Sequence, residues 1–197
     1  MFHVEQLEKY IELLLKWQKK INLISSDSIS DLQNRHIKDS LQLVKFIPAE
    51  TKTIIDIGSG AGLPGIPLAI STGIKTFLIE SDLRKTIFLD EVIRQLDLNA
   101  VTINKRMEEA SVPQTIEPVV ITARAVSALE NIFELLDSFL EKNNITSYKL
   151  LLLKGKNVSR ETLEAEKHWE FNAIYEKSET DSESSIVLID KFKRKAK

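Results

Sequence analysis

Glycines gather in one short stretch of this chain, which has six glycines in 197 residues. Four of them follow directly after the apolar run 53–57: Gly58, Gly60, Gly62 and Gly65. A glycine-rich turn between a strand and a helix exposes backbone N–H groups without side chains in the way, and the helix N-terminus favours negative charge. The stretch therefore predicts a turn that binds a nucleotide-like ligand.

Two carboxylates flank this turn at positions that suit a nucleoside. Asp56 stands near the end of the apolar run, and Glu80 closes the next apolar run, 22 residues after Gly58. That spacing suits an acid that accepts hydrogen bonds from both ribose hydroxyls of an adenosine. Asp56 can approach the amino-acid end of S-adenosylmethionine, directly or through water. As isolated residues, both carboxylates also fit helix capping or an exposed surface.

Two classes of ligand remain open for the turn. Residues 60–65 match the G-x-G-x-x-G pattern of dinucleotide-binding proteins. In that pattern the first glycine makes the tight turn straight after the strand, but here Gly58 already occupies that place. The alternative is a methyl-donor turn, which begins at Gly58 and is preceded by Asp56. An acid at Glu80 would bind the ribose of either NAD or S-adenosylmethionine, so this residue does not discriminate between the two ligands.

Apolar strands and amphipathic helices alternate from residue 53 onward. Short, continuously apolar strands separated by helices are typical of a parallel sheet covered on both faces. The last two strands are close enough to pair as an antiparallel hairpin. We therefore expect an α/β, Rossmann-like, doubly wound sheet of the class I methyltransferase outline. The expected strands are 53–57, 75–80, 100–104, 118–123, 148–153, 170–176 and 185–191, with helices at 83–96, 128–141 and near 160–168.

Residues 1–47 have helical rather than strand periodicity. Apolar side chains recur at three- and four-residue spacing over the first helix, and a second helix is expected from Ile29 to Phe46. Two amphipathic helices cannot bury their apolar faces alone, so they should pack on the sheet domain or cover its ligand. A coiled-coil dimer is the competing interpretation. We divide the chain into an N-terminal helical extension, 1–47, and a domain of the methyltransferase type, 48–197.

Composition excludes several kinds of chemistry. The chain has no cysteine, which excludes disulfides, thiolate metal ligands and a cysteine nucleophile.

No apolar run approaches the roughly 20 residues that span a bilayer. The first residues lack the basic and apolar regions of a secretion signal, so we expect a cytoplasmic protein. The formal net charge of −2 gives no overall attraction to nucleic acid, although basic clusters occur at 154–160 and 191–197.

The string from Asp56 to Ala69 resembles the glycine turn of the RsmG (GidB) family, whose members methylate guanine N-7 in small-subunit (16S) ribosomal RNA. Further segments agree with the family in order and spacing, so the similarity covers roughly residues 10–190. They are Trp17 with Asn22-Leu23, Arg35-His36 with Asp39-Ser40-Leu41, Glu80-Ser81 with Lys85 and Phe88-Leu89, Arg106 to Glu109, Thr122 to Ala125, and Leu153-Lys154-Gly155.

The resemblance implies S-adenosylmethionine as methyl donor and S-adenosylhomocysteine as product. It places the donor against the turn 58–63 and against Glu80, with Met107 and Glu108 beside the adenine. The donor-binding residues expected are Asp56, Gly58, Ser59, Gly60, Gly62, Leu63, Glu80, Met107, Glu108 and Arg124.

Arg124 matches the family arginine after the fourth strand, and we expect it to be catalytic. A strand-end arginine suits a carboxylate, a phosphate or a base edge. A structural salt bridge is the alternative for this residue. Lys154 follows the fifth strand, where it either contacts RNA phosphate or is solvated.

Arg35 and His36 lie on the expected second helix and match a family motif, which makes them candidates for RNA contact. For His36, a histidine packed between helices and hydrogen-bonded to Asp39 or Ser40 is the favoured alternative. The family resemblance implies 16S ribosomal RNA within the small ribosomal subunit as the partner. We expect no membrane and no metal as partners, and we expect the protein to be a monomer.

The chemistry of guanine N-7 fits this residue set. Its lone pair is nucleophilic without loss of a proton, so alignment with the methyl group is the main requirement. Enzymes that methylate exocyclic amines usually carry an Asn/Asp-Pro-Pro-aromatic string after the fourth strand, where this chain has Ile121 to Arg124. Three other functions remain open: an NAD-dependent oxidoreductase, a non-catalytic RNA-binding or assembly protein with a nucleotide-binding fold, and a small-molecule methyltransferase.

Overall fold

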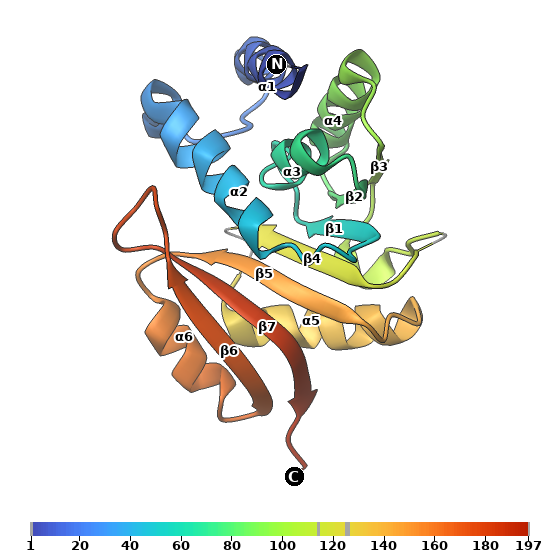
Figure 1. Ribbon diagram of the computed structural model, residues 1–197, viewed down its shortest axis with the longest axis vertical. Helices are drawn as coiled ribbons and strands as arrows, with labels where there is room; N and C mark the ends of the chain where they lie inside the picture. The colour runs from blue at the N-terminus through green and yellow to red at the C-terminus, as the bar shows by residue number, and fades with distance from the viewer. Residues whose placement is uncertain (1, 114, 125–126, 197) are drawn as a thin grey trace.

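The computed structural model describes residues 2–113, 115–124 and 127–196. Its seven strands are β1 Thr53–Ile57, β2 Lys75–Ile79, β3 Ala100–Ile103, β4 Val119–Arg124, β5 Tyr148–Lys154, β6 Trp169–Lys177 and β7 Ser185–Arg194. They form one sheet in the order β3-β2-β1-β4-β5-β7-β6 (Figure 1). The first five strands pair in parallel, and β7 pairs antiparallel with β5 and β6. The expected sheet with an antiparallel hairpin is confirmed.

Helices cover both faces of the sheet, as Figure 1 shows. They are α1 Phe2–Gln18, α2 Asp39–Leu41, α3 Gly65–Thr72, α4 Leu83–Leu96, α5 Leu129–Lys142 and α6 Val158–Ala165. Ile54 packs with α3 on one face, and its neighbour Ile55 packs with α5 on the other. Because both sides of these parallel strands are covered, their sequences are mostly apolar instead of alternating strictly with polar residues.

The first helix shares a core with the sheet domain. Tyr10 and Leu14 of α1 are fully buried in one apolar cluster with Ile66 of α3 and Phe88 of α4. The ring of Trp17 lies 5.8 Å from that of Phe88, centroid to centroid. The expected packing of the first helix on the sheet domain is therefore confirmed.

The expected helix from Ile29 to Phe46 is present, but it is irregular. The chain forms a 3-10 turn at Ser26–Asp31, a π turn at Gln33–Lys38, the short α2, and a second 3-10 turn at Gln42–Phe46. Tertiary contacts explain the irregularity, because backbone and side-chain groups of this segment bond to β4 and to the β6–β7 turn. Periodicity alone does not report such contacts.

Candidate active site

A cleft of about 180 Å³ opens at the carboxyl ends of β1, β2 and β3. We call it the β1–β3 cleft. Ligands of open α/β sheets bind at this edge. Four of the expected donor-binding residues line it: Gly58, Glu80, Met107 and Glu108. Gly58 has a φ of 64°, a left-handed conformation that glycine adopts without strain, so the chain turns sharply as β1 ends.

Glu80 is fixed in the wall of the β1–β3 cleft. Its Oε2 accepts a hydrogen bond from the Gly60 N–H at 2.8 Å, and its Oε1 accepts one from the Asp82 N–H at 2.8 Å. Each carboxylate oxygen keeps a second lone pair. The side chain therefore holds the glycine turn and still offers acceptors to the hydroxyls of a ligand.

Asp56 lies beneath the turn instead of lining the cleft. It is fully buried, and its oxygens accept hydrogen bonds from the Thr122 hydroxyl at 2.7 Å and the Gly65 N–H at 3.3 Å. Burial raises the pKa of the Asp56 carboxyl to about 6, and those hydrogen bonds oppose the shift. The remaining expected donor-binding residues of the turn are also not among those that line the cleft: Ser59, Gly60, Gly62 and Leu63.

Tyr10 holds the same turn from below, although the sequence patterns did not single it out. Its hydroxyl donates a hydrogen bond to the Ala61 carbonyl at 2.7 Å. Burial raises the pKa of Tyr10 far above its ordinary value, so the hydroxyl stays protonated and remains a donor. The sequence does contain one indication of this role. Tyr10 lies among the regularly spaced apolar residues of the first helix, so its hydroxyl is expected to be buried and to need a hydrogen-bond partner.

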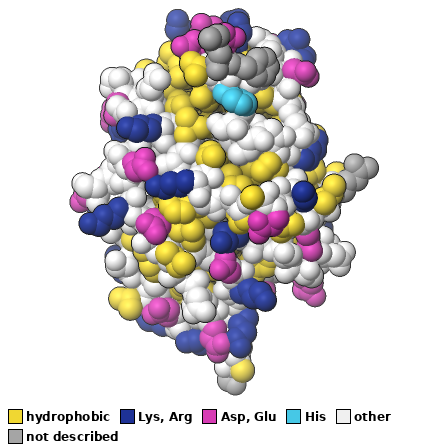
Figure 2. Space-filling model, viewed as in Figure 1, with side chains coloured by type: hydrophobic (Ala, Val, Ile, Leu, Met, Phe, Trp, Pro, Cys, Tyr) yellow, Lys and Arg dark blue, Asp and Glu magenta, His cyan; other side chains and the backbone are white. Residues whose placement is uncertain are grey.

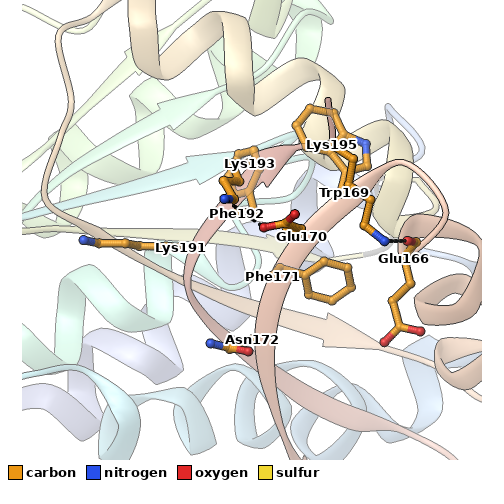
Figure 3. A pocket seen from close by; sticks show the side chains of 9 residues that line it. All are labelled: Glu166, Trp169, Glu170, Phe171, Asn172, Lys191, Phe192, Lys193 and Lys195. Carbon is orange, nitrogen blue, oxygen red and sulfur yellow. Dashed lines mark hydrogen bonds and ion pairs between the residues drawn. The ribbon is translucent and has the colours of Figure 1, made fainter. Parts of the chain in front are cut away.

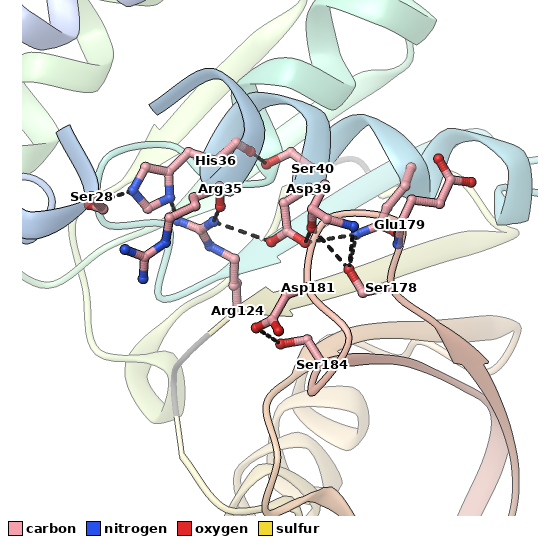
Figure 4. Close-up of polar contacts among 12 residues, drawn as sticks. Ser28, Arg35, His36, Asp39, Ser40, Arg124, Ser178, Glu179, Asp181 and Ser184 are labelled. Atoms are coloured by element: carbon pink, nitrogen blue, oxygen red, sulfur yellow. Dashed lines mark hydrogen bonds and ion pairs between the residues drawn. The ribbon is translucent and has the colours of Figure 1, made fainter. Parts of the chain in front are cut away.

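A second cleft, of about 320 Å³, opens at the ends of β4 and β5. This β4–β5 cleft is lined by the four residues expected near substrate: Arg35, His36, Arg124 and Lys154. Figure 4 shows Arg124 reaching from β4 to the N-terminal segment. Its guanidinium donates to the Arg35 carbonyl at 3.1 Å and to His36 Nδ1 at 2.8 Å, and it pairs with Asp39 at 3.4 Å. The salt bridge considered as an alternative for Arg124 is present.

Of the two expected partners of His36, Ser40 is confirmed, because its hydroxyl donates to the His36 carbonyl at 2.6 Å, but the ring bonds neither Asp39 nor Ser40. Its Nε2 lies 2.8 Å from the Ser28 hydroxyl oxygen, and its Nδ1 faces Arg124. Burial and then the positive charges of Arg124 and Arg35 lower the pKa of His36 to about 4. The ring is therefore neutral at neutral pH, and Nδ1 accepts the hydrogen bond from Arg124.

Lys154 is not solvated, contrary to one of the two expectations. It is 8% exposed, pairs with Glu161 at 2.6 Å and donates to the Ser127 carbonyl at 2.5 Å. Glu161 also accepts the Leu129 N–H, which begins α5. The ammonium group is thus held between α5 and α6 at the floor of the β4–β5 cleft.

The β6–β7 turn closes the other side of this cleft. The Thr180 hydroxyl donates to Asp39 at 2.8 Å, and the Glu179 N–H donates to the Gln42 side chain at 2.9 Å. Through Asp39, three segments far apart in the sequence meet at Arg124 (Figure 4).

A larger hollow, of about 830 Å³, lies on the hairpin at the opposite edge of the sheet (Figure 3). Two of its three lysines are engaged, since Lys193 pairs with Glu170 at 2.8 Å and Lys195 donates to the Glu166 carbonyl at 2.6 Å. None of the expected site residues, all of which the structure describes, lines this hollow.

Among the described residues, no group of three or more His, Asp or Glu side chains is arranged to hold a metal ion. Over the same parts of the chain, no helix has the length and apolarity needed to cross a bilayer.

Comparisons with known proteins identify the family of this chain. The chain is 43% identical over 190 residues to the ribosomal RNA small subunit methyltransferase G of Gluconobacter oxydans (strain 621H), covering 96% of this chain and 94% of the relative. The protein of the same name from Rickettsia rickettsii (strain Sheila Smith) is 41% identical over 186 residues, covering 94% and 93%. A mutant of MtNAS solved with S-adenosylmethionine shares the fold, with a TM-score of 0.60 at 15% identity over 96% of this chain and 76% of that chain. A family model described as rRNA small subunit methyltransferase G (GidB) matches residues 3–194, and the chain belongs to this family.

Proposed function

We propose that this protein transfers a methyl group from S-adenosylmethionine to N-7 of a guanine in 16S ribosomal RNA. The observation that carries the proposal is the order of groups along one edge of the sheet. Glu80 stands beyond β2 and Gly58 beyond β1, followed by Arg124 at the end of β4 and Lys154 at the end of β5. A donor bound at the first two strands leaves its methyl group facing an acceptor at the next two.

The residues of the β1–β3 cleft fit the adenosine part of the donor. Glu80 has free lone pairs for the ribose hydroxyls, Gly58 leaves room beside the backbone, and Met107 and Leu135 supply apolar surface for the adenine. When bound, the donor supplies the methyl group as a sulfonium. Asp56, with both oxygens bonded inside the protein, acts by holding the turn.

The β4–β5 cleft suits the acceptor base. Because guanine N-7 needs no deprotonation, its residues have only to orient the ring nitrogen toward the methyl carbon. Such alignment contributes on the order of 7–11 kcal/mol. Arg124 is held at the strand end by Asp39 and His36, where its guanidinium faces a base edge or a phosphate.

The surface charge favours a substrate presented within a particle. The net charge is −2, and Figure 2 shows Lys and Arg interspersed with Asp and Glu on the face drawn. We propose that the substrate is the small ribosomal subunit, whose folded RNA presents the guanine. The protein acts there as a cytoplasmic monomer, with residues 1–47 as a helical extension of the methyltransferase domain 48–197.

Labelled S-adenosylmethionine and small subunits that lack the modification test the proposal. Mapping of the label should place it on N-7 of one guanine, with poor transfer to a short naked hairpin. Label at another atom would contradict the N-7 assignment. Equal transfer to the hairpin would contradict the proposal that the substrate is the small ribosomal subunit. Binding to subunits without transfer would favour a non-catalytic assembly protein.

A further inference from the structure

The β6–β7 turn reaches the site from the side away from the donor. Its strands stand last in the sheet order, beyond β4 and β5. Thr180, Asp181 and Ser184 of this turn line the β4–β5 cleft together with Arg124 and Lys154. Figure 4 shows the Asp181 carboxylate on the turn, bonded to Ser184. The cleft therefore has cations on the strand side and a carboxylate on the hairpin side.

Asp181 is an ionised and oriented acceptor. Its Oδ2 accepts the Ser184 hydroxyl at 2.7 Å, and its Oδ1 accepts the Glu183 N–H at 3.0 Å. The Ser184 bond first, then the Glu183 bond and the charge of Arg35, lower the pKa of Asp181. The residue is exposed, and each oxygen keeps a lone pair for a group in the cleft.

Asp39, the other carboxylate of this cleft, is already engaged. One oxygen accepts hydrogen bonds from Gln42 and Thr180, and the other faces Arg124. Of the two carboxylates that line the cleft, Asp39 keeps one lone pair, on the oxygen that faces Arg124, whereas Asp181 keeps one on each of its oxygens.

The hydrogen-bonding edges of guanine match a cleft with cations on one side and a carboxylate on the other. N-7 and O6 are neighbouring acceptors on one edge of the base. The N1–H and the N2 amino group are neighbouring donors on the far side of the ring. If N-7 points toward the donor at β1, the O6 edge lies near Arg124 and the two donors reach the β6–β7 turn. A carboxylate accepts both donors side by side, whereas adenine presents an unprotonated N1 there and is repelled.

Resting on the proposed N-7 transfer, we propose that Asp181 selects guanine by accepting hydrogen bonds from its N1–H and N2 amino group. It is a specificity-determining residue on the hairpin turn, opposite the cationic wall. The assignment gives the antiparallel hairpin a direct role in substrate choice.

The test compares Asp181→Asn with Glu183→Gln, which removes one charge from the same turn outside the cleft. The substrates are small subunits assembled with either guanosine or inosine at the modified position, since inosine lacks the N2 amino group. The wild type should prefer guanosine on the order of ten-fold in kcat/KM, the lower range for one good base contact. For Asp181→Asn, kcat/KM on guanosine subunits should fall on the order of ten- to a hundred-fold, and the variant should not prefer guanosine subunits over inosine subunits.

Glu183→Gln should match the wild type on both substrates, and S-adenosylhomocysteine should bind all three proteins equally in calorimetry. An Asp181→Asn enzyme that keeps the wild-type preference for guanosine would overturn the proposal. So would a loss of activity that equals the loss in Glu183→Gln. If the wild type places no methyl group on N-7, the proposed function itself fails, and this result is visible before any variant is compared.

Discussion

The Tyr10 hydroxyl donates a 2.7 Å hydrogen bond to the Ala61 carbonyl, which joins α1 to the glycine turn across 51 residues of sequence. Neither residue lines the β1–β3 cleft. The bond nevertheless fixes the turn next to Gly60, whose N–H donates to the Glu80 carboxylate. The N-terminal helix is therefore coupled to the geometry of the proposed donor site.

Tyr10→Phe should weaken the binding of S-adenosylhomocysteine severalfold in calorimetry. It should also lower the free energy of unfolding by about 1 kcal/mol, because the buried Ala61 carbonyl loses its partner. Thr76→Val is the matched control, since it removes a buried hydroxyl bonded to the Ile74 carbonyl at 2.9 Å. The control should lose stability without losing ligand affinity. Unchanged affinity in Tyr10→Phe would contradict the coupling.

Gly65→Ala should destabilise the protein by about 1–3 kcal/mol, as expected for an overpacked core. A Cβ at this position would lie 2.8 Å from Asp56 Oδ2 and would press on the Leu78 side chain. Gly155→Ala should change the free energy of unfolding by less than about 0.5 kcal/mol. Its Cβ would meet nothing within 4 Å. Urea denaturation of both variants makes the comparison, and equal stabilities would refute the close packing of α3 on Asp56.

The buried Asp56 should make stability fall as pH rises. Its pKa goes from an ordinary 3.8 to about 6 in the folded protein, which therefore binds the proton more tightly than the unfolded chain does. Proton binding to Asp56 stabilises the folded protein fully below the unfolded-state pKa of 3.8. This stabilisation is lost as the pH rises through the folded-state pKa of about 6. The free energy of unfolding of the wild type, minus that of Asp56→Asn, should fall by about 3 kcal/mol over this window. A difference that does not vary with pH would disprove the shift.

Arg124→Ala should lower the rate of methyl transfer and reduce stability by about 1–3 kcal/mol, since it removes the guanidinium that pairs with Asp39 and bonds His36 Nδ1. Arg124→Lys keeps the charge but lacks the planar fork, so it should recover stability in part and little of the rate. Lys45→Ala is the control, because it breaks an exposed ion pair with Glu179 at the same interface. That pair should contribute less than about 1 kcal/mol and leave the rate unchanged. Arg124→Lys with the wild-type rate would argue against a role for the guanidinium.

The sheet and the glycine turn that borders the β1–β3 cleft could be predicted from the sequence, because they depend on local patterns. The apolar run 53–57, the glycines after it and Glu80 at the end of the next strand mark a strand, a turn and a neighbouring strand end. Parallel pairing then brings these groups to one edge. Helix α4 was predicted with its observed bounds, since its apolar residues recur at regular spacing.

The partners of the buried polar groups could not be predicted, because they depend on register and on contacts between distant segments. Asp56 meets Thr122 only because β1 and β4 pair in the register that places these two residues opposite each other. Arg124 meets Asp39 across 85 residues, at the point where the irregular helical segment passes from a π-helical turn into α2. No local pattern reports either contact.

A crystal structure of the protein with S-adenosylhomocysteine tests the central claim most directly. The account predicts that the ribose hydroxyls lie on Glu80, that the adenine lies beside Met107, and that the sulfur faces the β4–β5 cleft. A nucleoside bound elsewhere with the β1–β3 cleft left open, or NAD seated in that cleft when both ligands are supplied, would contradict it.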